Sequence, residues 1–369
     1  MSSQYEAIVI GGGPAGLATS RELARAGVNH LVLERGDQIG HTWANLYDGL
    51  VLHTGKHLSA LPGMPFPAST PLFPTRRDFL AYLQTYADTF KLPVRTGADV
   101  AAVERDGDAW MVRTTEGVEM RARAVVVATG IVANPQVPAI PGRDRFRGRV
   151  MHSVEYRRPD GFHRVLVVGA GNSAAEIAVE LANAGADVTI AVRSGARVVP
   201  LRLFGIPSQY FAVALGRLPR TVFRRVIAAI GRVSELFRGP AVLPPPGDKF
   251  CSTVPLIGFH LADAIRAGSI RLKRGIESFT VDGVRFNDGS EEPFHEVILA
   301  TGYTAAVRPL GNLVRLDECG FAVRRRRVIS ADQPGLYFVG HNYDVRGGLR
   351  NIAQDARLAA REVRQAVRS

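Results

Sequence analysis

The fold is decided near the start of the chain by the segment Ala7-Ile8-Val9-Ile10-Gly11-Gly12-Gly13-Pro14-Ala15-Gly16. Its four apolar residues predict a buried strand, and the G-x-G-x-x-G spacing predicts a tight turn into a helix that extends to residue 26. The glycines permit the bend, the approach of a pyrophosphate and close packing of helix on strand. Glu34 ends the next expected strand, residues 31–33, where a carboxylate grips a ribose diol. The segment therefore predicts a dinucleotide site at a helix N-terminus.

A second copy of this plan occurs in the middle of the chain. Residues 165–168 predict a strand, and Gly169-x-Gly171-x-x-Ala174 repeats the turn with alanine in third place, before a helix over residues 172–184. The next strand, residues 188–192, ends at Arg193-Ser194 instead of a carboxylate. A guanidinium beside a hydroxyl binds a 2′-phosphate that a carboxylate would repel. The first site therefore predicts FAD and the second NADPH.

This repetition predicts an α/β protein with two Rossmann-like dinucleotide-binding domains. We expect an FAD-binding domain at residues 1–132 plus 303–369, into which an NADPH-binding domain of residues 133–302 is inserted. Shorter patterns complete the expected elements: a helix at 76–90, an antiparallel meander at 100–103, 109–114 and 118–121, buried strands at 124–128 and 297–300, a hairpin at 321–329, a strand at 336–339 and a helix at 349–367.

The composition excludes several classes of function. The chain has 369 residues with 46 Lys and Arg against 34 Asp and Glu, a net charge of +12. That charge favours anionic partners, but no nucleic-acid module accompanies it, so no nucleic-acid partner is expected. No apolar run reaches the ~18–20 residues that span a bilayer, and the first strand is not a leader peptide. A cytoplasmic protein is expected.

Four further features are interpreted as structural. The basic amphipathic stretch at 221–237 is interpreted as a cover over a substrate tunnel, with weak membrane contact as the alternative. The arginine run at 324–327 is interpreted as a solvated face. His53 and His57 lack a third ligand, so no metal site is expected. Cys251 and Cys319 are expected to be reduced and form no C-x-x-C pair, which argues against a disulfide reductase.

The linker before the second glycine turn carries a family fingerprint. Residues 146–156 spell F-x-G-x-x-x-H-x-x-x-Y. With this motif the chain resembles the class B flavin-dependent monooxygenases. Because the motif ends in Tyr156 without Trp-Pro, it is similar to the N- and S-oxygenating and plant YUCCA branches more than to the Baeyer–Villiger branch. Residues 42–43, 52–56 and 61–67 look like the flavin-facing loop, and residues 300–303 and 335–340 resemble the A-T-G-[YF] turn and the C-terminal FAD strand.

The motifs and the resemblance together assign the cofactor-binding residues. Those expected to bind FAD are Gly11, Gly13, Pro14, Ala15, Gly16, Glu34, Arg35, Thr42, Trp43, His53, Val100, Thr129, Gly130, Gly340 and Leu349. Those expected to bind NADPH are Gly169, Gly171, Asn172, Ser173, Ala174, Arg193, Ser194, Thr301, Gly302 and Tyr303.

The resemblance also implies a reaction. NADPH reduces FAD, O2 forms a flavin C4a-(hydro)peroxide, and one oxygen atom enters a small organic substrate by N- or S-oxygenation or by oxidative decarboxylation of an α-keto acid. His53, which stands where animal relatives carry asparagine, and Lys56 are expected to be catalytic donors to the peroxide. His152 and Tyr156 are expected to fix the linker.

Other functions stay open at this point. Baeyer–Villiger oxygenation of a ketone and an NAD(P)H–flavin reductase that passes electrons to a quinone or O2 are the alternative enzymes. An FAD-binding redox sensor is the alternative outside catalysis, and Arg193 argues against it because a sensor has no need to select NADPH. The expected partners are a small-molecule substrate and O2, and the oligomeric state is open, with a dimer among the options.

Overall fold

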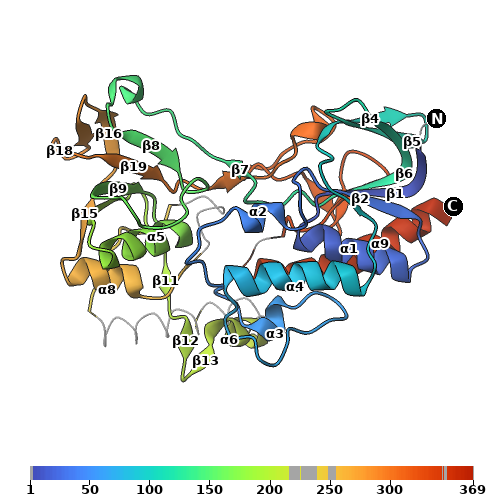
Figure 1. Cartoon of the computed structure of the whole chain (residues 1–369), viewed down its shortest axis with the longest axis horizontal. Coiled ribbons are helices and arrows are strands. Elements are labelled where there is room, and N and C mark those ends of the chain that lie inside the picture. Colours follow the sequence, from blue (N-terminus) through green and yellow to red (C-terminus); the bar gives the residue numbers. More distant parts are fainter. Residues whose placement is uncertain are drawn as a thin grey trace. The chain divides into compact units, whose positions relative to one another are not determined.

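The computed structural model describes residues 3–215, 225, 239–247, 255–342, 344 and 347–368. The chain divides into two compact units (Figure 1). Unit 1 comprises Met1–Asn45, Thr54–Asn134 and Tyr303–Ser369, and unit 2 comprises Leu46–His53 and Pro135–Gly302. Leu46–His53, which we expected in the first domain, belongs to unit 2. Apart from Arg225, the expected basic helix at 221–237 lies outside the described residues.

Unit 1 is built on a mixed sheet with the strand order β21-β22-β23-β6-β1-β2-β3. Its centre is parallel: Ile8 pairs with Leu31 on one side and with Val125 on the other. All three side chains are buried, as expected for a strand covered on both faces. The strands are β1 (Ser3–Ile10), β2 (His30–Leu33), β3 (Val94–Arg95), β6 (Glu119–Val127), β21 (Arg324–Arg325), β22 (Ile329–Ser330) and β23 (Leu336–Phe338).

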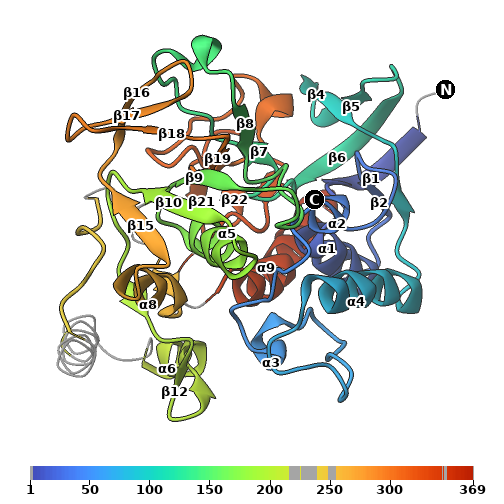
Figure 2. The same cartoon turned by 60° about the vertical axis from the view of Figure 1, so that its left-hand side comes forward.

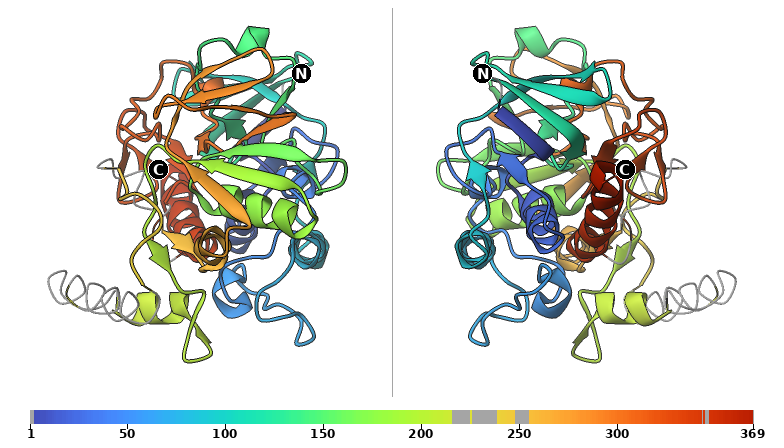
Figure 3. Two further views of the ribbon diagram at one scale, coloured as in Figure 1. Left: turned by 90° about the vertical axis from the view of Figure 1, so that its left-hand side faces the viewer. Right: turned by 90° about the vertical axis from the view of Figure 1, so that its right-hand side faces the viewer.

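Two helices lie side by side beneath this sheet, α1 (Pro14–Arg25) and α9 (Gly348–Arg368) (Figure 3). Helix α1 begins with proline, whose missing N–H costs nothing at a first helical position, and ends before Gly27, which adopts a left-handed φ of +69°. Helix α4 (Arg76–Thr89) begins with a capping box between Thr75 and Asp78. The shorter helices are α2 (His41–Ala44), α3 (Lys56–Ser59) and η3 (Arg308–Leu310).

Strand β6 differs from the expected pair of strands at 118–121 and 124–128. On one side its first half pairs antiparallel with β5 (Ala109–Thr114), which in turn pairs with β4 (Val100–Asp106). On the other side β6 runs parallel to β1 from Met120 to Val127. The residues between the two expected strands include no glycine or proline, so nothing interrupts the extended backbone. One strand therefore joins the meander to the parallel sheet.

Unit 2 is built on a parallel sheet with the strand order β15-β10-β9-β19-β8. Helices α5 (Asn172–Asn183) and α8 (His260–Arg266) cover one face, and the antiparallel strands β16 (Ile276–Phe279), β17 (Gly283–Phe286) and β18 (Glu291–Pro293) lie over the other (Figure 2). The parallel strands are β8 (Arg149–His152), β9 (Arg164–Val168), β10 (Asp187–Ala191), β15 (Ile270–Lys273) and β19 (Glu296–Leu299). The remaining elements of the chain are β7 (Asn134–Pro135), η1 (Arg143–Arg145), β11 (Val198–Val199), β12 (Arg202–Leu203), β13 (Ile206–Pro207), α6 (Ser208–Leu215), β14 (Leu256–Ile257) and, in unit 1, β20 (Tyr303–Thr304).

Two expectations about single residues are wrong. Arg327 is not a solvated charge: its Nε donates to Oδ1 of the fully buried Asp355 at 2.9 Å, because the hairpin turn at Arg326 and Arg327 has left-handed φ angles that bring this side chain inward. Cys319 is not a reduced thiol, since it takes part in a disulfide. Among the described residues, no helix is long and apolar enough to cross a membrane.

Candidate functional site

The first glycine turn, between β1 and α1, is shaped for a group that approaches the backbone. Gly11 has a φ of +112°, and a Cβ there would lie 2.5 Å from the Ala128 carbonyl oxygen. At Gly16 a Cβ would overlap the Gly11 carbonyl oxygen, so only glycine fits. At Gly13 a Cβ would meet nothing within 4 Å. Close packing at Gly11 and Gly16, with open space at Gly13, the second glycine of the motif, is the arrangement expected for a pyrophosphate-binding turn.

The amides at this turn have the charge preference of an anion site. Gly13 is the N-cap of α1 and supplies no side-chain hydrogen bond to the first helical turn. Those N–H groups are therefore available to an external acceptor, and the helix dipole favours a negative one.

Glu34 lies directly beside this turn, at the end of β2. Its side chain is 7% exposed, and its Oε2 accepts the Gly12 N–H at 2.7 Å while Oε1 accepts the Gly36 N–H at 2.9 Å. The carboxylate is thus held at the glycine turn from both sides and retains further lone pairs for hydroxyl donors.

Other residues expected at this site are positioned in different ways. Gly340 follows β23 with a φ of +86°, and a Cβ there would be 3.0 Å from the Ala15 Cβ, so this turn packs against the glycine turn. Thr129 uses its hydroxyl to hold Ala306 O at 2.7 Å. Val100 and Leu349 are buried, at 6% and 8% exposure. Both residues therefore pack in the interior of unit 1.

The predicted residues of the 35–43 segment divide between surface and packing. Arg35 is exposed, whereas Trp43 on α2 packs edge-on against Phe79 with ring centroids 4.5 Å apart. Thr42, next to Trp43 on α2, is partly buried.

The second glycine turn, between β9 and α5, repeats this geometry except at the third position of the motif, where alanine replaces glycine. Gly169 has a φ of +134°, and a Cβ there would overlap the Ala300 carbonyl oxygen. Gly171, the N-cap of α5, has open space at its Cβ position and no side-chain cap. The third position accommodates Ala174, fully buried. Asn172 is engaged elsewhere in unit 2, because its amide accepts from Ile257 N at 2.9 Å and donates to Pro255 O at 3.3 Å.

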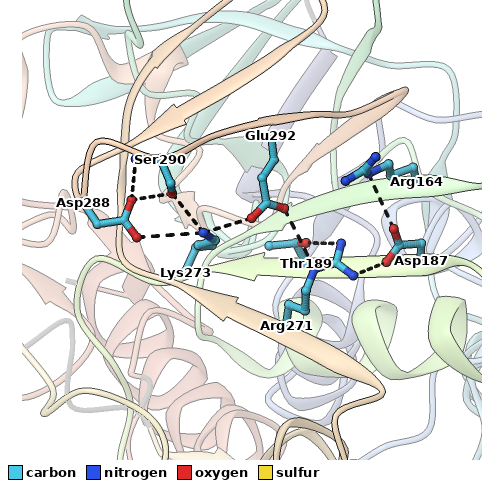
Figure 4. Close-up of polar contacts among 8 residues, drawn as sticks. All are labelled: Arg164, Asp187, Thr189, Arg271, Lys273, Asp288, Ser290 and Glu292. Atoms are coloured by element: carbon cyan, nitrogen blue, oxygen red, sulfur yellow. Dashed lines mark hydrogen bonds and ion pairs between the residues drawn. The ribbon is translucent and has the colours of Figure 1, made fainter.

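The end of β10 presents charge opposite in sign to Glu34. Arg193 and Ser194 are exposed, and Val192, just before them, donates its N–H to Lys273 O at 2.9 Å. An ionic network links β10 and β15 to β18 and to the turn that precedes it (Figure 4). Within it Lys273 Nζ lies 2.9 Å from Glu292 Oε1, and Arg271 lies 2.5 Å from Asp187 Oδ1 and 3.0 Å from Thr189 Oγ1. The residue just before Arg193 is thus hydrogen-bonded to β15.

Two residues of the 146–156 motif hold unit 2 together. His152 Nδ1 accepts the Val154 N–H at 3.2 Å, so Nε2 carries the proton that it donates to Gly302 O at 3.1 Å. Burial lowers the pKa of His152. The Tyr156 hydroxyl donates to Glu180 Oε2 at 2.8 Å, and burial raises the pKa of both groups. Thr301, beside Gly302, donates to Gln136 O at 2.5 Å.

The two predicted catalytic residues fall in different units. Lys56 lies in unit 1, where Nζ donates to three backbone carbonyls, Thr70 O at 2.6 Å, Ala68 O at 2.9 Å and Pro67 O at 3.3 Å. All three ammonium protons are therefore engaged. His53 lies in unit 2, where Nε2 donates to Glu176 Oε1 on α5. Tyr303 is the first residue of the last segment of unit 1, Tyr303–Ser369.

Comparison with known proteins decides the family. Residues 8–199 match the pyridine nucleotide-disulphide oxidoreductase family. The chain is 36% identical over 376 residues to indole-3-pyruvate monooxygenase YUCCA1 of Oryza sativa subsp. japonica, an alignment that covers 97% of this chain and 91% of the relative. The chain belongs to the flavin-dependent monooxygenases.

Solved structures of such monooxygenases have the same fold. A flavin-containing monooxygenase from Stenotrophomonas maltophilia aligns over 98% of both chains with a TM-score of 0.77 at 26% identity. Cyclohexanone monooxygenase from Rhodococcus sp. Phi1 aligns over 100% of this chain and 85% of its own, with a TM-score of 0.71 at 18% identity. The protein is thus a flavin monooxygenase with two Rossmann-type domains, an oxidoreductase that uses a flavin and a nicotinamide cofactor.

The residues of this monooxygenase fit such cofactors. Each unit has a glycine turn with open space at its second glycine. The twelve-residue helix that follows has no side-chain cap at its N-terminus, so its first amides are available to one pyrophosphate. Among the described residues, no group of His, Cys, Asp or Glu is arranged to hold a metal ion.

Sequence reasoning missed Glu176 and Glu180. They lie one turn apart on α5 and accept hydrogen bonds from His53, Tyr47 and Tyr156. The available signal was the spacing of two carboxylates four residues apart on a helix otherwise rich in alanine, directly after the glycine turn.

Proposed function

We propose that this monooxygenase binds FAD in unit 1 and NADPH in unit 2, and that it transfers one oxygen atom from O2 to a small organic substrate. The observation that carries the proposal is the contrast between the two strand ends: a buried carboxylate follows β2, and an exposed guanidinium and hydroxyl follow β10. The first suits a dinucleotide whose ribose has free hydroxyls, and the second suits one with a 2′-phosphate.

Unit 1 offers FAD a set of backbone donors and one carboxylate. The amides at the start of α1 would hold the pyrophosphate, and Glu34 would accept hydrogen bonds from the adenosine ribose. Gly340 keeps the following turn close to Ala15 and so bounds the same site.

Unit 2 offers NADPH the matching donors. The amides at the start of α5 would hold the pyrophosphate, and Arg193 with Ser194 would hold the 2′-phosphate. The Lys273 carbonyl supports this pair through Val192, so its backbone is pre-organised for the phosphate.

FAD bound by the α1 amides and Glu34 would supply the two-electron chemistry between NADPH and O2. One oxygen atom enters the product and the other leaves as water. The first substrate class to consider is an α-keto acid, which loses CO2 as it gains oxygen, because the curated relatives at 36% identity are named for indole-3-pyruvate. N- and S-oxygenation are the other reactions of this group.

Of the two predicted catalytic donors, His53 is the stronger candidate. The three ammonium protons of Lys56 are engaged by the carbonyls of residues 67–70, which supports a role in holding that loop. An imidazole presents two ring nitrogens, and when one is engaged by a carboxylate the other still serves a substrate or cofactor.

The test is an isotope experiment. Purified protein reconstituted with FAD is reduced anaerobically by NADPH or NADH and then exposed to ¹⁸O₂ with indole-3-pyruvate, a tertiary amine, a sulfide or a ketone. We expect faster bleaching with NADPH and one ¹⁸O atom in the product of one substrate, measured by mass spectrometry. Reduction followed only by release of hydrogen peroxide or quinone reduction would show a reductase, and incorporation only into the ketone a Baeyer–Villiger enzyme.

A further inference from the structure

One carboxylate in unit 2 receives two donors from the same short segment. Leu46–His53 supplies the Tyr47 hydroxyl, which donates to Glu176 Oε2, and the His53 Nε2–H, which donates to Glu176 Oε1. The His53 and Glu176 side chains are 23% and 18% exposed, so water reaches the pair only in part. Each carboxylate oxygen therefore has its own protein donor.

The segment has other anchors in unit 2. The Tyr47 ring belongs to the core around Val165, Ile177 and Ile298, and the Asp48 N–H donates to Arg157 O at 2.8 Å. Residues 46–53 thus stay packed on unit 2 without the Glu176 charge. What the carboxylate adds is the orientation of the imidazole.

The chemistry of the groups fixes the histidine tautomer. An ionised carboxylate only accepts hydrogen bonds, so the ring nitrogen facing it must carry a proton. In neutral His53 that proton is on Nε2, and Nδ1 is the acceptor. In the opposite tautomer, two lone pairs would face each other across the contact.

We propose that Glu176 is the positioning residue for His53: it holds the imidazole as the Nε2–H tautomer with a set ring direction and so presents Nδ1 for the oxygenation chemistry. The proposal rests on the proposed function for the use of Nδ1, but the tautomer itself does not. Glu176 acts through His53 and is not itself a catalytic residue.

The same helix provides a matched control. Glu180 lies one turn further on α5 and also accepts from a buried ring, Tyr156, at 2.8 Å. Glu180→Gln therefore removes a charge and perturbs a buried hydrogen bond in the same helix without touching His53. Glu176→Gln makes the equivalent change at the proposed position, and Glu176→Asp keeps the charge on a shorter side chain.

The first measurement is independent of turnover. Two-bond ¹H–¹⁵N correlation spectra of ¹⁵N-histidine-labelled holoenzyme report the tautomer of each imidazole, with His53 assigned by its loss in His53→Gln. We expect the Nε2–H pattern in wild type and Glu180→Gln, and a mixed or Nδ1–H pattern in Glu176→Gln. An unchanged His53 pattern in Glu176→Gln would overturn the proposal even if the variant is less active.

The second measurement is the hydrogen peroxide released per NADPH oxidised, with the best substrate. We expect Glu176→Gln to raise this ratio at least threefold with the KM for NADPH within twofold, Glu176→Asp to recover at least half of the loss, and Glu180→Gln to match wild type. The double variant with Glu176→Gln and His53→Gln should release no more hydrogen peroxide per NADPH than His53→Gln alone. Equal effects of Glu176→Gln and Glu180→Gln, or additive effects with His53→Gln, would assign Glu176 a merely structural role. If wild type oxygenates nothing, the proposed function fails while the spectra still decide the tautomer.

Discussion

The two glycine turns use one backbone design with different side chains. In unit 1 the third position must be glycine because α1 lies against the Gly11 carbonyl, whereas α5 in unit 2 leaves room for Ala174. In unit 1 the buried carboxylate of Glu34 lies beside the turn, whereas in unit 2 the exposed residues Arg193 and Ser194 follow the corresponding strand. This contrast supports the proposal that unit 1 encloses FAD and that unit 2 exchanges NADPH.

The largest expected effect comes from filling the tight position of unit 1. Gly16→Ala places a methyl group on the Gly11 carbonyl oxygen, so we expect a loss of roughly 3 kcal/mol in the free energy of unfolding and purification without flavin. Absorbance at 450 nm and thermal unfolding measure both. Gly13→Ala is the control: its methyl group meets no protein atom, so it should lose flavin but keep apoprotein stability. Normal flavin content in Gly16→Ala would contradict the packing argument.

The next effect separates the two cofactors. Arg193→Ala removes the guanidinium expected at the 2′-phosphate, so the KM for NADPH should rise at least about tenfold while that for NADH changes less than about twofold. Steady-state reduction kinetics measure both constants. Arg147→Ala removes another exposed positive charge from unit 2 and should change neither. Parallel increases for the two coenzymes would assign Arg193 to general electrostatics.

A smaller effect is expected at the acid of unit 1. Glu34→Gln keeps one acceptor oxygen but turns an NH₂ group toward either the Gly12 or the Gly36 N–H, so FAD affinity should fall about five- to tenfold. Titration of apoprotein with FAD measures the dissociation constant. The KM for NADPH should stay within about twofold, since unit 2 is untouched. A change confined to NADPH would reverse the assignment of the two units.

The last effect, which is absent at neutral pH, is an acid sensitivity of unit 1. His341 is 2% exposed between the rings of Phe321 and Phe338, and burial lowers its pKa to about 3. Below pH 6.5 the unfolded chain binds a proton at His341 that the folded chain does not bind. The free energy of unfolding therefore falls as the pH drops from about 6.5 to 3. At pH 5 this amounts to about 2 kcal/mol, and above pH 7 the contribution vanishes.

Fluorescence can assign that loss to one unit. Both tryptophans, Trp43 and Trp110, belong to unit 1, so their emission follows unit 1 whereas circular dichroism follows the whole chain. His341→Phe should move the acid transition of the emission to lower pH, and His163→Asn, an exposed position in unit 2, should not. An unshifted transition in His341→Phe would show that other groups control acid unfolding.

Local features of the molecule could be predicted from the sequence. The glycine turns, their flanking strands and helices, and the residues at the strand ends depend on contacts close in the chain, and the structure has these elements within a few residues of the expected bounds. The continuous strand β6 was missed because polar residues at its middle resemble a turn when read alone.

Long-range contacts could not be predicted. Glu176 is 123 residues from His53, and no periodicity links them. The three carbonyls around Lys56 and the buried partner of Arg327 depend on loop conformation, which charge patterning does not encode. The exposure of Arg327 was therefore overestimated, and the backbone partners of Lys56 were not foreseen.

The membership of Leu46–His53 in unit 2 constrains how this protein can be dissected. The chain passes between the units four times, so neither half is a continuous piece with one clean insertion point. A fragment of residues 135–302 made alone would lack Tyr47, which is 5% exposed in the core of unit 2, and would have a hole there. Exchange of nicotinamide-binding modules between relatives should therefore carry this eight-residue segment along with the inserted domain.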